Sequence, residues 1–178
     1  MAGTSITIED AALQAWLRRS IQNLSHPADA LAEIGEILVK STQQRFATET
    51  NPDGERWAEN SDVTLLAHLN RRQDSYTKTG RLSAKGARRI GAKKILTDRG
   101  YLGDLIRYQI EGTTAVLVGS DRKYAAVQQF GQKKGASGSF RGAPIPWGDI
   151  PARPFLGVSD DDRRDIEETL AAYIMPGA

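Results

Sequence analysis

The chain has 178 residues, of which 39% are hydrophobic and 26% are charged, and its formal net charge at pH 7 is +2. These ordinary values predict one globular domain over residues 1–178, large enough to bury a core, and they indicate no particular partner. The absence of cysteine excludes disulfides, thiol nucleophiles and cysteine-ligated zinc. There is no apolar run of the ~20 residues that a membrane helix needs, and the first residues do not resemble a signal peptide. We therefore expect a cytoplasmic protein that has no membrane partner.

The first part of the chain predicts a short strand followed by a helical hairpin. Residues 5–8 alternate and are rich in β-branched side chains, which favours a strand. Apolar side chains then recur at helical spacing over residues 13–24. Pro27 is well placed to begin a second helix, whose apolar stripe runs over residues 31–46. Gly35 lies within this stripe and indicates a close approach of the two helices.

A turn with a nearby tryptophan follows the helical hairpin. Pro52 occupies the second position of the turn, Gly54 completes it, and Trp57 comes three residues later. Taken alone, this pattern indicates a surface turn that is held by a buried tryptophan. Ser61 or Thr64 is a suitable cap for a short helix after it.

The stretch from about residue 70 to residue 94 is strongly basic and predicts an exposed loop or a small helical arm. Asp74 is its only acid, beside nine cationic residues: Arg71, Arg72, Lys78, Arg81, Lys85, Arg88, Arg89, Lys93 and Lys94. Clustered Lys and Arg side chains can contact DNA phosphates, but runs of charge are more often solvated or meet an acidic protein. Tyr76 is the only aromatic residue there, so stacking on single strands has little support. Contact with DNA and contact with a partner protein both remain open.

The clearest β signal lies at about residues 104–119 and predicts an antiparallel hairpin around Gly112. A short helix is expected over residues 124–130, and Gly131 should end it. The Lys, Gly and Ser residues that follow predict a flexible loop at about residues 131–143.

The segment over residues 145–157 is the stiffest part of the chain. Its three prolines fix the backbone in extended conformations, and its apolar side chains, Phe155 among them, are expected to dock on the body. Ser159 is placed to cap a last helix, at about residues 159–174, whose first turn is acidic. Together these elements predict an α+β fold with an N-terminal helical hairpin, a small antiparallel sheet and a C-terminal helix packed on that sheet.

No residue pattern in the chain predicts catalysis or a cofactor. His26 and His68 are the only histidines, and they lack the spacing of a helical metal site. The Gly-rich phosphate-binding motifs and the nucleophile motif G-x-S-x-G are absent. Asp160, Asp161 and Asp162 favour the start of a helix rather than a cation site, because three adjacent carboxylates supply no complete coordination shell. We therefore predict a protein without a catalytic, metal or cofactor site.

Several short motifs occur in a fixed order along the chain. The turn Pro-Asp-Gly is followed by Trp57, then by Val-Gly-Ser, Tyr-Ala and Phe-Gly, and finally by Ile-Pro-Ala-Arg-Pro-Phe-Leu-Gly at residues 150–157. In this order they resemble the phage virion morphogenesis, or tail-completion, family, which includes the Mu-type tail-completion proteins. We refer to the residues that carry the resemblance as the motif residues: Phe46, Pro52, Gly54, Trp57, Tyr124, Gly131, Pro151, Arg153, Pro154, Phe155 and Gly157.

The resemblance implies a structural, non-enzymatic protein of the tail end or neck, which completes the tail and enables head–tail joining. It also implies a homo-oligomeric ring, with six copies favoured, that meets tail tube, sheath or terminator proteins and head connector proteins. Such a protein would assemble in the host cytoplasm and remain in the virion of a phage or prophage, or in a tail-derived particle. The basic stretch departs from the family pattern, which leaves contact with packaged DNA open. The alternative is a small basic DNA-binding module that is not part of a virion.

Overall fold

The computed structural model describes residues 27–100, 102–136, 139–140, 143–144 and 149–174, and five separate residues before them, Ala15, Arg18, Arg19, Ile21 and Gln22. These five are helical, whereas the strand predicted at residues 5–8 and most of the first predicted helix lie outside the described residues. In chain order the elements are α2 (Ala28–Thr48), α3 (Asp62–Asn70), α4 (Ala84–Gly91), β1 (Arg107–Glu111), β2 (Ala115–Gly119), α5 (Ala125–Phe130), β3 (Ser139–Phe140), β4 (Ala143–Pro144) and α6 (Asp160–Ile174).

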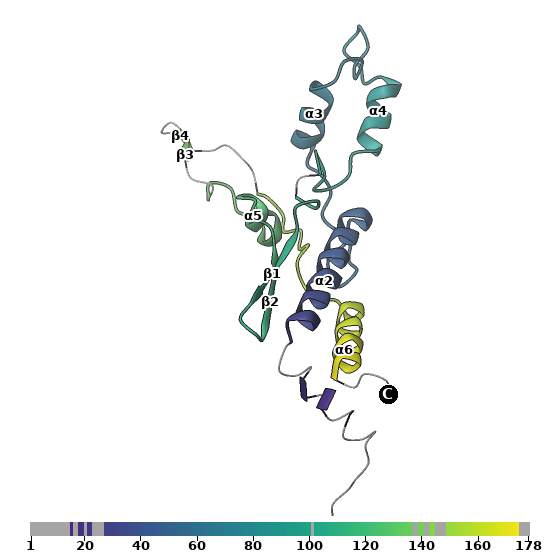
Figure 1. The fold of residues 1–178 in the computed structure, drawn as a ribbon. Helices are drawn as coiled ribbons and strands as arrows, with labels where there is room; N and C mark the ends of the chain where they lie inside the picture. Colours follow the sequence, from purple (N-terminus) through teal and green to yellow (C-terminus); the bar gives the residue numbers. More distant parts are fainter. Residues whose placement is uncertain are drawn as a thin grey trace, which may run out of the picture.

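Helix α2 is the centre of the body, since it contacts β1, β2 and α6 (Figure 1). It lies between the β1–β2 hairpin and the C-terminal helix, so the three elements form one layered body. Gly35 makes the closest approach to the sheet, because a Cβ atom there would lie 2.5 Å from ring atoms of Tyr108 on β1. The partner that the structure gives to Gly35 is therefore a strand residue, whereas we had expected a helix. The α+β class is confirmed.

The β1–β2 hairpin has the position that the sequence predicts. Its strands are antiparallel, with Arg107 opposite Gly119 and Glu111 opposite Ala115. Gly112 has a positive φ of 62°, which the tight connection requires. The predicted loop at about residues 131–143 contains β3, which pairs with β4, and Gln132 forms a bridge to Ile150.

Helices α3 and α4 form an arm that stands apart from the body, beyond the end of α2 (Figure 1). Ser61 caps α3 by accepting a hydrogen bond from the Thr64 N–H, and Ser83 caps α4 by accepting one from the Gly86 N–H. Asn60 closes the base of the arm, since its side-chain amide donates to the carbonyl groups of Lys93 and Lys94 at 3.3 and 3.4 Å. Within the basic stretch, residues 71–83 connect α3 to α4, and the helical residues are those of α4.

The main hydrophobic core lies at the C-terminal end of α2, where the segments of the body converge. Phe155 has no exposed surface, and the Phe46 ring centroid lies 5.3 Å from that of Trp57 and 5.4 Å from that of Phe155. The other buried members of this core are Ile95, Leu102, Ile106 and Ala125. No helix in the described part of the chain is both long and apolar enough to span a membrane.

Candidate functional site

Arg45 of α2 joins this helix to the stretch at residues 155–162, which is distant along the chain. Its guanidinium is buried and donates hydrogen bonds to the carbonyl groups of Phe155 and Gly157, both at 3.0 Å. The other terminal nitrogen donates to the Ser41 hydroxyl at 3.1 Å and forms an ion pair with Asp162 in the first turn of α6. These contacts, which we call the Arg45 cluster, fix the proline-rich segment and α6 on α2.

Asp162 is the anionic partner in the Arg45 cluster. Burial raises the pKa of Asp162. Hydrogen bonds from Ser41 and Ser159 and the charge of Arg45 lower it by a larger amount, so the pKa lies below its ordinary value. Asp162 and Ser159 cap each other reciprocally: the Ser159 N–H donates to the carboxylate at 2.8 Å, and the Asp162 N–H donates to the hydroxyl at 3.1 Å. The predicted cap of the last helix is thus confirmed, and Asp162 is a structural ion-pair partner.

The proline-rich segment is held on its other side by the turn region. The Arg153 Nε atom donates to the Ala58 carbonyl at 2.7 Å, and its Nη2 atom donates to the Glu59 carbonyl at 2.6 Å. Burial of this guanidinium lowers the pKa of Arg153. The Trp57 indole N–H donates to the Pro154 carbonyl at 2.8 Å. Five backbone carbonyl groups therefore receive side-chain donors from Arg45, Arg153 and Trp57, which leaves this segment little freedom.

Helix α5 supplies the remaining contacts through Gln129. Its side-chain oxygen accepts hydrogen bonds from the N–H groups of Phe155 and Leu156 at 3.0 Å, and its amide donates to the Leu156 carbonyl. Gly131 follows with a φ of +72°, and a Cβ atom there would lie 2.8 Å from the Ile150 carbonyl oxygen. Sequence reasoning missed Arg45 and Gln129, because a single polar residue in a helix gives no sign of its partner far along the chain.

Most of the motif residues gather around the proline-rich segment. Phe46, Trp57 and Phe155 form its aromatic core, and Arg153 and Pro154 bind the turn region. Gly157 lies against Pro52, since a Cβ atom there would be 2.6 Å from the proline Cγ atom. The remaining motif residues are more peripheral: Gly54 has a turn conformation, Tyr124 precedes α5, and Pro151 is exposed. The motif thus describes how one segment is anchored.

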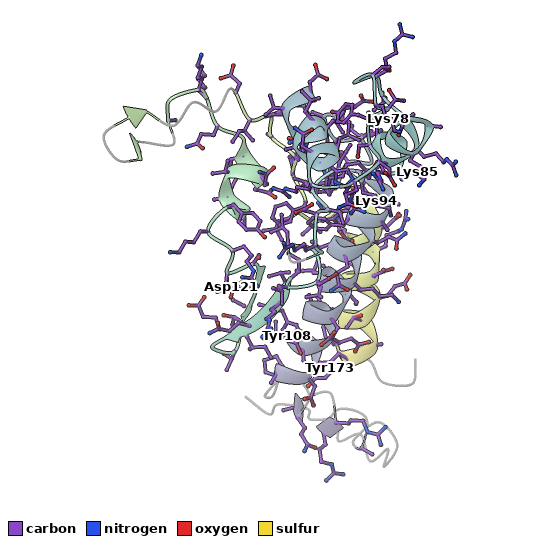
Figure 2. The ribbon with its side chains drawn as sticks, turned by 90° about the horizontal axis from the view of Figure 1, so that it is seen from above. Lys78, Lys85, Lys94, Tyr108, Asp121 and Tyr173 are labelled. Carbon is purple, nitrogen blue, oxygen red and sulfur yellow. The ribbon has the colours of Figure 1, made fainter. Side chains whose placement is uncertain are left out.

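The nine cationic residues of the basic stretch all lie on the arm or at its base. Figure 2 shows Lys78, Lys85 and Lys94 grouped there, away from Tyr108, Asp121 and Tyr173 on the body. Two of the nine form exposed ion pairs at 3.3 Å, Arg71 with Asp98 and Lys85 with Asp74. Of these nine, four have side chains that make no hydrogen bond or ion pair with another described residue: Arg72, Lys78, Arg81 and Arg88.

A depression of about 280 Å³ lies at the base of the arm and is strongly cationic. Its lining includes His68, Arg72, Arg89, Lys93, Lys94, Thr97 and Asp98. The pKa of His68 lies below its ordinary value because burial and the positive charges of Arg72, Lys93 and Arg71 lower it by more than the negative charge of Asp98 raises it. The sequence assigned no role to His68, since its neighbours on α4 and beyond are distant along the chain.

The described residues offer no metal site, because no three of their His, Asp and Glu side chains are grouped so as to hold an ion. They do expose large apolar side chains. Phe130 at the end of α5 is 78% exposed, and Val63 on α3 is 75% exposed. Both the arm and the body therefore carry exposed apolar side chains beside their polar groups.

Comparisons with known proteins identify the same family that the motifs resemble. The model of the phage virion morphogenesis family matches residues 8–175. The "Putative capsid assembly protein G" of Escherichia phage Mu is 31% identical over 134 residues, which cover 75% of this chain and 70% of that protein. The "Mu-like prophage FluMu G protein 2" of Haemophilus influenzae is 42% identical over 57 residues, 32% of this chain and 36% of that protein. No solved structure matches the chain significantly.

Proposed function

The chain belongs to the phage virion morphogenesis family, and from this premise we propose that it completes the phage tail and makes the tail end competent to join the head. Family membership gives it a structural role in virion assembly. What supports the tail end in particular is the motif at residues 150–157, which resembles that of tail-completion proteins and lies in the segment that Arg45, Trp57 and Arg153 anchor. A rigid body with a projecting arm suits a protein that presents fixed surfaces to neighbouring subunits.

A homo-oligomeric ring is part of this proposal, with six copies favoured. Contacts between two different surfaces of identical subunits generate rings when the rotation closes. The exposed side chains of Phe130 and Val63 lie on different elements, α5 and α3, and would be covered in such a contact. The ring would meet tail tube, sheath or terminator proteins on one side and head connector proteins on the other.

The position within the virion is the finer point that an experiment must decide. The name of the Mu relative refers to capsid assembly, whereas our proposal concerns the junction between tail and head. Electron microscopy of lysates from the producing phage or prophage, with this gene deleted, separates the two. Full heads beside unjoined tails of normal or abnormal length are expected. Malformed or missing heads would instead place the protein in capsid assembly and overturn the proposal.

The same micrographs test the alternative of a DNA-binding module outside the virion. Family membership disfavours it, because the family is one of virion assembly. Normal joined particles in the deletion lysate would refute tail completion and return this alternative to first place. Complementation by the intact gene, and not by a gene with an early stop codon, is the matched control for effects on neighbouring genes.

A further inference from the structure

The depression at the base of the arm gathers cations from separate parts of the chain. Arg72 follows α3, Arg89 belongs to α4, and Lys93 follows α4. Asp98 is the single acid in the lining, and it already forms an ion pair with Arg71. The depression therefore carries positive charge that no described residue balances.

Two of these cations are held in place without being neutralised. Arg89 donates to the Gln73 carbonyl at 2.7 Å and to the Ser75 hydroxyl at 2.8 Å. Lys93 donates to the Thr97 carbonyl. Neutral carbonyl and hydroxyl groups fix a side chain but leave its charge available to an anion. An anion that binds here would lose little affinity to side-chain ordering, because that ordering exists beforehand.

We propose that this depression binds a phosphate group of the DNA backbone, with Arg72, Arg89 and Lys93 as its cationic ligands. The arrangement favours a polyanion because the exposed cations continue along the arm, at Lys78, Arg81, Lys85 and Arg88. Residues 70–94 contain nine cations and one acid, a net charge of +8, whereas the whole chain has +2.

The spread of the cations supports the same occupant. Duplex DNA carries one charge per ~1.7 Å along its axis, so its phosphates can meet several cations of the arm at once. An acidic side chain on a neighbouring subunit would neutralise only one cation.

His68 provides the direct measurement, because the chain has only two histidines and their imidazole signals are readily resolved by NMR. Burial and the nearby cations Arg72, Lys93 and Arg71 hold the pKa of His68 down, and Asp98 opposes them. A bound phosphate would offset these charges, so a short DNA duplex should raise the pKa of His68. An unchanged His68 pKa at saturating DNA would overturn the proposal.

Charge variants provide the second test. Removal of two phosphate contacts in R72Q/K93Q should reduce the slope of log affinity against log salt by about 2, at ~0.9 per contact. The control variant K40Q/K123Q removes two exposed cations from α2 and from the segment before α5, and it should bind DNA as the unmodified chain does. Equal slopes for the two variants would refute the site. Equal melting temperatures establish that both are folded.

Two other outcomes identify a different occupant and overturn the proposal. If inorganic phosphate raises the pKa of His68 and DNA does not, the depression is a site for small anions. Self-association that R72Q/K93Q abolishes, without any DNA binding by the unmodified chain, would assign the cations to a neighbouring subunit. The inference depends on the proposed function in one respect, namely the place in the virion where the protein would meet DNA. Binding by the isolated protein and the micrographs of the deletion mutant are separate measurements, so either can fail alone.

Discussion

Replacing Arg45 by methionine is the most direct test of how the C-terminal half is held on α2. The variant leaves the Asp162 carboxylate buried beside an apolar side chain, and it removes the donors to the Phe155 and Gly157 carbonyl groups. Removal of one partner from a buried ion pair costs about 3–5 kcal/mol. For a chain of this length each kcal/mol lowers the melting temperature by about 2–4 °C, so R45M should melt roughly 6–20 °C lower.

The structure supplies a matched control for this substitution. Arg56 also forms an ion pair, with Glu49 at 3.2 Å, but its side chain is 69% exposed. An ion pair with a solvated arginine contributes about 0–1 kcal/mol, and Glu49, whose side chain is 15% exposed, keeps the hydrogen bond that it accepts from the Ile95 N–H, so R56M should melt within a few degrees of the unmodified chain. Thermal unfolding followed by circular dichroism measures both variants under the same conditions.

A double-mutant cycle with D162A then tests whether the two residues act together. Because each single variant leaves an unpaired buried charge, the double variant should be more stable than the sum of the two losses predicts, by about 0.5–3 kcal/mol. Equal destabilisation by R45M and R56M, or strict additivity in the cycle, would refute the role that we assign to the Arg45 cluster.

Three further predictions concern the same body. The pKa of Asp162 is lowered in the folded state, so its stabilising contribution is complete above its unfolded pKa of ~3.9 and is lost as pH falls through the lower folded value. The free energy of unfolding of D162N should therefore fall less steeply than that of the unmodified chain below about pH 4. An equal dependence on pH in the two proteins would contradict this. F155A should lose about 3–5 kcal/mol in urea unfolding, because the side chain is fully buried, whereas the exposed F130A should change by less than ~0.5 kcal/mol; equal effects would contradict the core assignment. G131A should cost more than ~1 kcal/mol, since its φ is positive and a Cβ would meet backbone atoms, unlike the control G119A, where nothing lies within 4 Å; a neutral G131A would disprove the close contact.

Local signals explain most of what the sequence predicted correctly. Ser61 and Ser159 cap helices through hydrogen bonds that span three residues, so the pattern and the structure refer to the same few positions. The hairpin around Gly112 is equally local. The proline-rich segment was recognisable because proline restricts the chain wherever it occurs.

The long-range contacts could not be predicted from a single sequence. Arg45 and Asp162 are 117 positions apart, and nothing in the spacing of α2 distinguishes Arg45 from a solvated arginine. The charge of the basic stretch was evident, but its concentration around His68 depends on how α3 and α4 come together. The interpretation of the basic residues as DNA or protein contacts stays a prediction.

The closed base of the arm has a consequence for how such a protein can change. The Asn60 amide joins the two ends of the arm, and within the described residues α3 and α4 contact each other rather than any other helix or strand. The arm is therefore a separate structural unit: it can be lengthened, shortened or exchanged at one point of the body, while the Arg45 cluster is undisturbed. A phage lineage that meets a new partner at this surface could change the arm alone and keep the body that anchors it.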